Sequence, residues 1–125
     1  MADLCPCNSD LVYHKCCEPY HQNKTIPAKP ETLMRSRYCA YALHKVDYLI
    51  ETTHLSIRHL HQKTAIKAWA EANVWLRLEI CFAKEDIVEF KAYYQHKGKI
   101  QVHHERSIFK KEGERWYYLS GSYFD

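Results

Sequence analysis

Four cysteines near the start of the chain constrain its structure more than any other feature of the sequence. Cys5 and Cys7 flank a proline, and Cys16 and Cys17 are adjacent. Thiolates are soft ligands, and a group of four suits the closed tetrahedral coordination of zinc. We therefore expect these four cysteines to hold one structural zinc ion. His21 is a nearby nitrogen donor and is the alternative ligand to Cys17.

The compartment of the protein decides between metal binding and disulfide formation. The first residues show neither the basic segment nor the apolar run of a signal peptide, and no apolar run is long enough to span a bilayer. We therefore expect a cytoplasmic protein without membrane association, in which clustered cysteines bind metal. The even count of six cysteines keeps a disulfide framework as the alternative. Cys39 and Cys81 stand alone in apolar segments, which predicts two buried, inert thiols.

The residues between the two cysteine pairs predict a turn followed by a short helix. Asn8-Ser9-Asp10 is favourable for a turn and a helix N-cap. A helix is therefore expected to begin near Leu11, to carry Cys16 in its last turn and to end before Pro19. Adjacent helical side chains diverge by about 100°, so one of the two neighbouring cysteines has to leave ideal helix geometry.

The rest of the chain is long enough to form one domain with its own core. With 125 residues, the sequence fits one domain plus a small appendage. The proline-bearing segment 25–30 marks the expected boundary, between a cysteine knuckle at 1–24 and a domain at 28–125. The formal net charge of +3 is too weak to predict nucleic-acid binding.

Hydrophobic periodicity predicts helices first and strands afterwards. Apolar residues recur at helical spacing over 31–44, 46–54 and 63–72, and Pro30 suits the first helical position. From Val74 onward the period changes to two, which indicates half-buried strands. The expected strands, joined by short turns, cover residues 74–82, 88–94, 100–108 and 116–120. Helices followed by an antiparallel meander define the α+β class.

The polar stretch His104-Glu105-Arg106-Ser107 on the third expected strand supplies the main pocket candidates outside the cysteines. His104 and Arg106 alternate with the apolar residues of 100–108 and are therefore expected to face inward, with Glu105 and Ser107 on the opposite face. A charge on a core-facing register has to be paired or to line a cavity. His104 and Arg106 are then either the floor of a pocket or part of a buried ion pair. A β-bulge that turns them outward is a further alternative.

Two further groups of residues are weaker candidates. Arg35 and Arg37 on the first long helix can add positive charge to the same pocket, although a solvated or capping face is the more usual explanation for two arginines that flank a serine on a helix. His54, His59 and His61 form a possible metal-binding set in an irregular segment.

The cysteine pattern C-P-C-x-S-x6-C-C resembles the SEC-C motif, a zinc-binding module found at the C-terminus of SecA and in many small bacterial proteins. The usual Gly-Ser-Gly after the second cysteine is Asn8-Ser9-Asp10 here, which leaves the ligands in place. The knuckle together with LMRSRY at 33–38, HHERS at 103–107 and RWYYLSG at 115–121 resembles the YchJ family of SEC-C proteins. That resemblance implies a nuclear transport factor 2-like fold, a curved sheet wrapped around helices to form a cone with a pocket.

The resemblance implies a metal and a fold but no reaction. SEC-C modules of SecA bind a secretion chaperone and ribosomes, so the first hypothesis is a non-catalytic protein that docks a cytoplasmic protein partner through its knuckle. The alternative is a small-molecule sensor or enzyme that uses the pocket of the cone. The sequence shows no Ser/His/Asp set, P-loop or paired carboxylates at readable spacing, which favours binding over catalysis. Trp75 and Tyr93 are suited to a homodimer contact through the sheet.

Overall fold

The computed structural model describes residues 3–124 and confirms the α+β class, with helices packed on a curved, four-stranded antiparallel sheet of order β1-β2-β3-β4. The helices are α1 (Glu18–His21), α2 (Pro30–Ala42), α3 (Val46–Glu51), α4 (Leu55–Arg58) and α5 (Lys63–Ala72), with one 3-10 turn at Tyr13–Lys15. The strands are β1 (Asn73–Lys84), β2 (Ile87–His96), β3 (Lys99–Glu112) and β4 (Arg115–Phe124). Among the described residues, no helix is long and apolar enough to cross a membrane.

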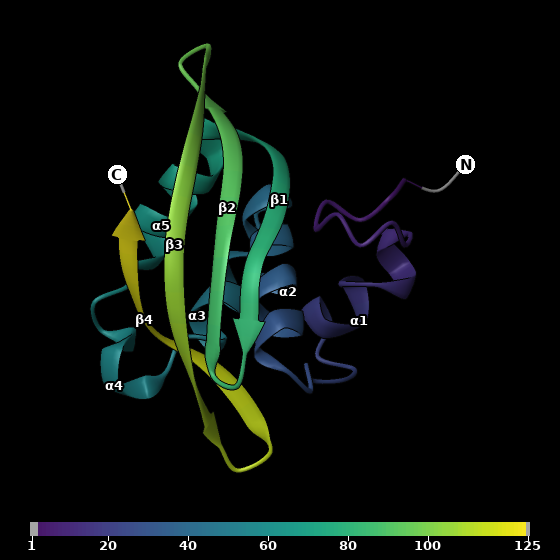
Figure 1. Ribbon diagram of the computed structural model, residues 1–125, viewed down its shortest axis with the longest axis vertical. Helices are drawn as coiled ribbons and strands as arrows, with labels where there is room; N and C mark the ends of the chain where they lie inside the picture. Colours follow the sequence, from purple (N-terminus) through teal and green to yellow (C-terminus); the bar gives the residue numbers. More distant parts are fainter. Residues whose placement is uncertain (1–2, 125) are drawn as a thin grey trace.

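Helix α2 is the main element packed on the sheet. Pro30 lies at its first position, where the missing N–H costs nothing, and Glu31 favours the positive end of the helix dipole. His44 follows the helix with a φ of 61°, the left-handed conformation that ends many helices. Figure 1 shows α2 behind the strands, with the purple N-terminal segment beside the edge strand β1. The core between α2 and the sheet consists of Leu33, Met34, Tyr38, Leu78, Val88, Phe90, Ala92 and Phe109.

Both edges of the sheet are covered by residues from outside it. On β1, the backbone N–H of Leu78 donates to the side-chain oxygen of Asn8 at 2.6 Å. On β4, the backbone of Tyr118 bonds on both sides to the segment after α3, donating to Thr52 O and accepting from His54 N, each at 2.8 Å. These contacts satisfy edge groups that would otherwise be open to pairing with another chain.

The prediction of a helix from Leu11 into Cys16 is wrong. Only the 3-10 turn precedes Cys16, and Cys17 is the N-cap of α1, with Pro19 in the first turn of that helix. Proline therefore starts a helix here and does not end one, because its missing N–H is tolerated in a first turn. The break between the two cysteines solves the geometric problem of adjacent side chains that diverge on a helix.

The predicted inward face of β3 is also wrong. Ile100 and Val102 are exposed, whereas Glu105, Ser107 and Phe109 are buried. His104 and Arg106 therefore lie on the outer face, and Glu105 and Ser107 lie on the inner one. Alternation in a strand shows only which residues share a face and not which face is buried. In this strand each of the two alternating sets contains apolar residues that could face the core.

Register shifts explain a similar error on β1. Its pairing with β2 is irregular just after Trp75 and again after Ile80. Val74 and Leu76 alternate with the neighbouring residues in the same set as Leu78, yet they are exposed while Leu78 is buried, and Trp75 packs against the core. A bulge adds one residue to one strand and so exchanges the two faces beyond it.

Two neighbouring residues of β3 test the observed register. Phe109 is 1% exposed and Ile108 is 40% exposed. We expect Phe109→Ala to lower the free energy of unfolding by about 3–5 kcal/mol, because it leaves a cavity in the core. Ile108→Ala, the control, is expected to cost less than about 1 kcal/mol. Urea unfolding of the metal-loaded protein measures both, and equal losses would contradict this register.

Candidate functional site: a cysteine cluster and an aromatic cavity

The four cysteines of the N-terminal motif come together in space. The sulfur atoms of Cys5, Cys7, Cys16 and Cys17 all lie within 4.8 Å of one another. Cys7 Sγ is 3.5 Å from Cys16 Sγ, which is 3.9 Å from Cys17 Sγ. A tetrahedral site with metal–sulfur bonds of about 2.3 Å has sulfur–sulfur edges of about 3.8 Å. The cluster therefore has the spacing of a four-thiolate metal site.

The turn between the cysteine pairs keeps its shape without glycine. Asn8 and Asp10 both have positive φ angles, of 65° and 70°. Asparagine and aspartate are the residues other than glycine that most readily adopt this conformation. Ser9 Oγ lies 3.0 Å from Cys16 Sγ, so this hydroxyl also contacts the cluster. The departure from Gly-Ser-Gly therefore preserves the geometry of the loop.

Helix α2 contacts the cysteine cluster with one of its faces. Cys39 is buried, as expected, and its sulfur lies 3.6 Å from that of Cys5. Arg35 donates to the carbonyl oxygen of Cys7 at 2.7 Å, which places a positive charge beside the cluster. His21 is bound elsewhere: its Nε2–H donates to Ser36 O at 2.8 Å, and its Nδ1 accepts from a tyrosine hydroxyl. This arrangement favours Cys17 over His21 as the fourth ligand.

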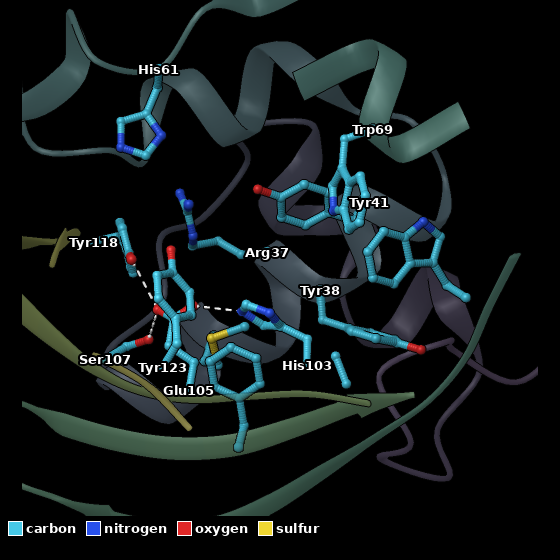
Figure 2. A pocket seen from close by; sticks show the side chains of 14 residues that line it. Arg37, Tyr38, Tyr41, His61, Trp69, His103, Glu105, Ser107, Tyr118 and Tyr123 are labelled. Carbon is cyan, nitrogen blue, oxygen red and sulfur yellow. Dashed lines mark hydrogen bonds and ion pairs between the residues drawn. The ribbon is translucent and has the colours of Figure 1, made fainter. Parts of the chain in front are cut away.

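A cavity lies between another face of α2 and the inner face of the sheet (Figure 2). It has a volume of about 320 Å³, at the lower end of the range for small-molecule sites. Aromatic rings form most of its wall, and Arg37, His61, His103, Glu105 and Ser107 add polar groups. The aromatic residues are Tyr38, Tyr41, Trp69, Trp75, Phe90, Tyr118 and Tyr123.

Glu105 is a buried carboxylate with three hydrogen-bond donors. Its Oε1 accepts from His103 Nε2 at 2.8 Å, and its Oε2 accepts from the hydroxyls of Ser107 at 2.6 Å and Tyr118 at 2.9 Å. Burial acts to raise the pKa of Glu105, but these hydrogen bonds outweigh it and hold the pKa below its usual value. Glu105 is therefore ionised at neutral pH. A Cβ at Gly121 would overlap Glu105 and Tyr118, so this glycine makes room for the pair.

Arg37 is the buried cation of the cavity. It is 5% exposed, and its Nη1 donates to Leu49 O at 3.0 Å and to Thr52 Oγ1 at 2.7 Å. Its guanidinium carbon lies 4.8 Å from the centre of the Tyr118 ring, which gives a cation–π contact. Tyr118 therefore connects the two buried charges, since it contacts Arg37 with its ring and Glu105 with its hydroxyl.

Half of the predicted pocket residues line this cavity. Arg37, Glu105 and Ser107 do so, whereas Arg35 contacts the cysteine knuckle. His104 and Arg106 lie on the outer face, where each bonds to Glu89, at 2.9 Å and 3.0 Å. The ion-pair alternative is therefore correct in that Arg106 pairs with a strand carboxylate. The pair is not buried, because the Arg106 side chain is 51% exposed. An exposed pair contributes little to stability.

The other sequence candidates are dispersed. Cys81 is exposed, contrary to the prediction, and lies with Glu89 and His104 within 4.8 Å on the outer face of the sheet. His54 bonds to Glu112, His61 lines the cavity, and these two form no metal-ligand group with His59 within residues 3–124.

Two points remain from the sequence analysis: the residues of the expected dimer contact, and the cavity residues that were not predicted. Trp75 lines the cavity, and the Tyr93 hydroxyl donates to Glu79. The homodimer contact through these two residues stays a prediction. Sequence reasoning missed His103 and Tyr118 as cavity residues. His103 alternates with Glu105 and Ser107, so the correct register would have identified it.

The fold and the cysteine cluster together define a small α+β protein with a SEC-C motif, and comparison with known proteins agrees. A family model described as YchJ, middle NTF2-like domain, matches residues 29–121, and one for the SEC-C motif matches residues 1–19. Since the first match spans most of the chain, the chain belongs to the YchJ family. A UPF0225 protein of Actinobacillus succinogenes is 41% identical over 98% of this chain and 83% of its own length.

Solved structures share the same fold. The solution structure of a SEC-C motif containing protein from Rhodopseudomonas palustris is 40% identical, covers 100% of both chains and has a TM-score of 0.91. The crystal structure of a SEC-C motif containing protein from Psychrobacter arcticus is 35% identical, covers 93% of this chain and 80% of that one, and has a TM-score of 0.80.

The depressed pKa of Glu105 predicts a pH-dependent stability. A carboxylate with a lowered pKa stabilises the fold above its ordinary value of 4.5, and that contribution is lost as the pH falls. We expect Glu105→Gln to cost about 1–3 kcal/mol at pH 7, because its amide cannot accept from three donors. The difference from wild type should narrow below pH 4.5.

Chemical unfolding of both proteins from pH 7 to pH 3.5 measures this difference. Acid sensitivity of the cysteine cluster is common to both proteins and cancels. Glu114→Gln, a change at an exposed carboxylate, is the control and should leave the profile unchanged. A wild-type advantage that stays constant with pH would show that Glu105 is not ionised in the folded protein.

Proposed function

We propose that this protein is a zinc-stabilised, non-catalytic binding protein that holds a small ring-containing molecule in the cavity of its cone. The observation that carries the proposal is the cavity itself, with an aromatic wall and two buried, oppositely charged side chains, Arg37 and Glu105. Burying a charge is costly, and such groups are retained where they orient a ligand. Each charge is held by hydrogen bonds to the protein, so the site is formed before a ligand binds.

The knuckle contributes stability in this proposal. Zinc is the metal that four thiolates at this spacing fit best, and it supplies no redox chemistry. Cys5, Cys7, Cys16 and Cys17 would hold it, and the loop contacts α2 through Cys39 and Arg35. A structural metal of this kind fixes the side of α2 that faces away from the cavity.

The metal assignment predicts one zinc per chain. Structural zinc contributes on the order of 10–16 kcal/mol of apparent binding free energy at neutral pH, so protein purified without added metal should contain close to stoichiometric zinc. Cys5→Ser should lower the zinc content sharply. Cys39→Ala and Cys81→Ala, changes at one sulfur beside the cluster and one on the outer sheet face, should preserve it. Elemental analysis decides, and a metal-free protein with a protease-resistant N-terminus would contradict the assignment.

The cavity predicts ligand binding that a change of shape abolishes. Ala92 is buried and lines the cavity, whereas its neighbour Lys91 points to the other face of β2. We expect Ala92→Phe to fill part of the space and to remove binding of small ring compounds. Lys91→Phe is the matched control and should bind as wild type does. Ligand-observed NMR with a mixture of ring-containing metabolites measures this.

Equal binding to wild type and to the cavity variant would contradict the proposal. A set of compounds that bind wild type and the Ala92→Phe variant equally would show that the cavity is not the site. Circular dichroism and the melting curve of each variant establish that it is folded, since overpacking costs about 1–3 kcal/mol.

A second function is supported by the surface of the knuckle. Leu4 is 61% exposed and Leu11 is 53% exposed, and an isolated bridge joins Leu4 to Val12 beside Leu11. Two exposed leucines on a metal-stapled loop favour docking of a protein partner. SEC-C modules of SecA suggest secretion chaperones and ribosomes as partners to test. Cosedimentation with purified ribosomes, lost in Leu4→Ser/Leu11→Ser and kept in Ile100→Ser, would support docking.

A further inference from the structure

We infer that the cavity takes an aromatic compound with a carboxylate, whose flat ring lies among the aromatic side chains and whose carboxylate binds the open edge of Arg37. This inference rests on the proposed binding function and adds the chemical class of the ligand. It follows from which hydrogen-bonding groups of the cavity are already occupied and which are open.

Arg37 has donors without acceptors. All three of its hydrogen bonds to described residues come from Nη1, to Leu49, Thr52 and Thr53. Nε and Nη2 have no acceptor among residues 3–124. The one fully enclosed side-chain nitrogen without a partner in that range is Arg115 Nε. The two Arg37 nitrogens are therefore not sealed from solvent, and they reach it through the cavity that Arg37 lines.

Arg37 also lacks a carboxylate partner. It forms no ion pair with the described residues. Glu105 lines the same cavity, but its oxygens already accept from His103, Ser107 and Tyr118. A guanidinium with two open, coplanar N–H groups matches a carboxylate in a bidentate arrangement. Both carboxylate oxygens of Glu105 therefore have hydrogen-bond partners in the protein, whereas Nε and Nη2 of Arg37 have none among the described residues.

The charges of the cavity limit a bound anion to a single negative charge. His61 lies near Arg37 (Figure 2), and burial, followed by the Arg37 charge, lowers the pKa of His61, so that it is neutral at pH 7. The ionised Glu105 in the same cavity opposes further negative charge. One guanidinium beside one carboxylate suits a monoanionic carboxylate better than a dianionic phosphate.

The remaining wall of the cavity suits a flat ring. Figure 2 shows Tyr41 and Trp69 on the side of the cavity away from His61 and Tyr118. Tyr41 and Trp75 have ring centres 5.5 Å apart, and those of Tyr38 and Trp75 are 6.0 Å apart at nearly a right angle. Offset and edge-on contacts of this kind extend naturally to the ring of a ligand. The volume of about 320 Å³ fits one ring or a fused pair.

Three compounds with the same indole ring and different charge test the inference. Indole-3-acetate is the anion, indole-3-acetamide is the neutral analogue and tryptamine is the cation. We expect calorimetric titration of the full, metal-loaded chain to show at least about ten-fold tighter binding of the acid than of the amide or the amine. Arg37→Met should reduce the affinity for the acid to that for the amide. Arg106→Met, the same substitution on the outer face, should change nothing.

The possible results separate the inference from the function on which it rests. Equal binding of the acid and the amide to wild type, or preferred binding of the amine, would overturn the carboxylate assignment and leave the cavity as a binding site. No binding by any of the three would count against the proposed function itself. If Arg37→Met does not fold, the Nε–H resonance of Arg37 in wild type decides: it should shift with the acid and stay unchanged with the amide.

Discussion

The packing of α2 between the cysteine cluster and the sheet is the constraint on which the rest of the structure depends. One face of the helix carries Arg35 and Cys39, which contact the cysteine cluster. A second face of the same helix carries Arg37 and Tyr41, which line the cavity. Residues three or four positions apart share a helix face, so one short sequence serves two sites. A change in how the knuckle holds α2 therefore reaches the cavity through one rigid element.

The interior of the cone contains two buried charges, Glu105 and Arg37, and both have hydrogen-bond partners in the protein. Glu105 has three donors, and Arg37 is anchored through Nη1 to the segment that follows α3. Buried charges that are only partly satisfied destabilise a fold. Of these two buried charges, Arg37 is the one that keeps open donors, and it lines a cavity. Polar groups that stability alone does not explain are the basis for assigning a function to this space.

The sequence predicted the local features well. The cysteine spacing located the four-sulfur cluster, although a 3-10 turn stands where a helix was expected before Cys16. The change of period after Asn73 located the strands. The class of fold followed from the order of helices and strands. Each of these features depends on residues close together in the chain, where propensity and periodicity are informative.

The sequence did not predict which face of the sheet turns inward. On β3, the apolar residues from Ile100 to Ile108 compete with a second set that contains Glu105 and ends in Phe109. The second set is buried because partners distant in sequence, such as the Tyr118 hydroxyl, satisfy the carboxylate. Bulges on β1 exchange its faces as well. Long-range pairing and single-residue insertions leave no local signal, so the cavity was visible only in three dimensions.

Amide hydrogen exchange on metal-loaded and chelated protein tests most directly whether the knuckle holds α2 in place. If it does, removal of the metal should speed exchange in residues 3–24 and in α2, while the central strands β2 and β3 stay protected. Unchanged protection of α2 after chelation would show that the knuckle is an independent appendage. Exchange through the whole sheet would show that the metal site is part of the core, and either result would contradict this account.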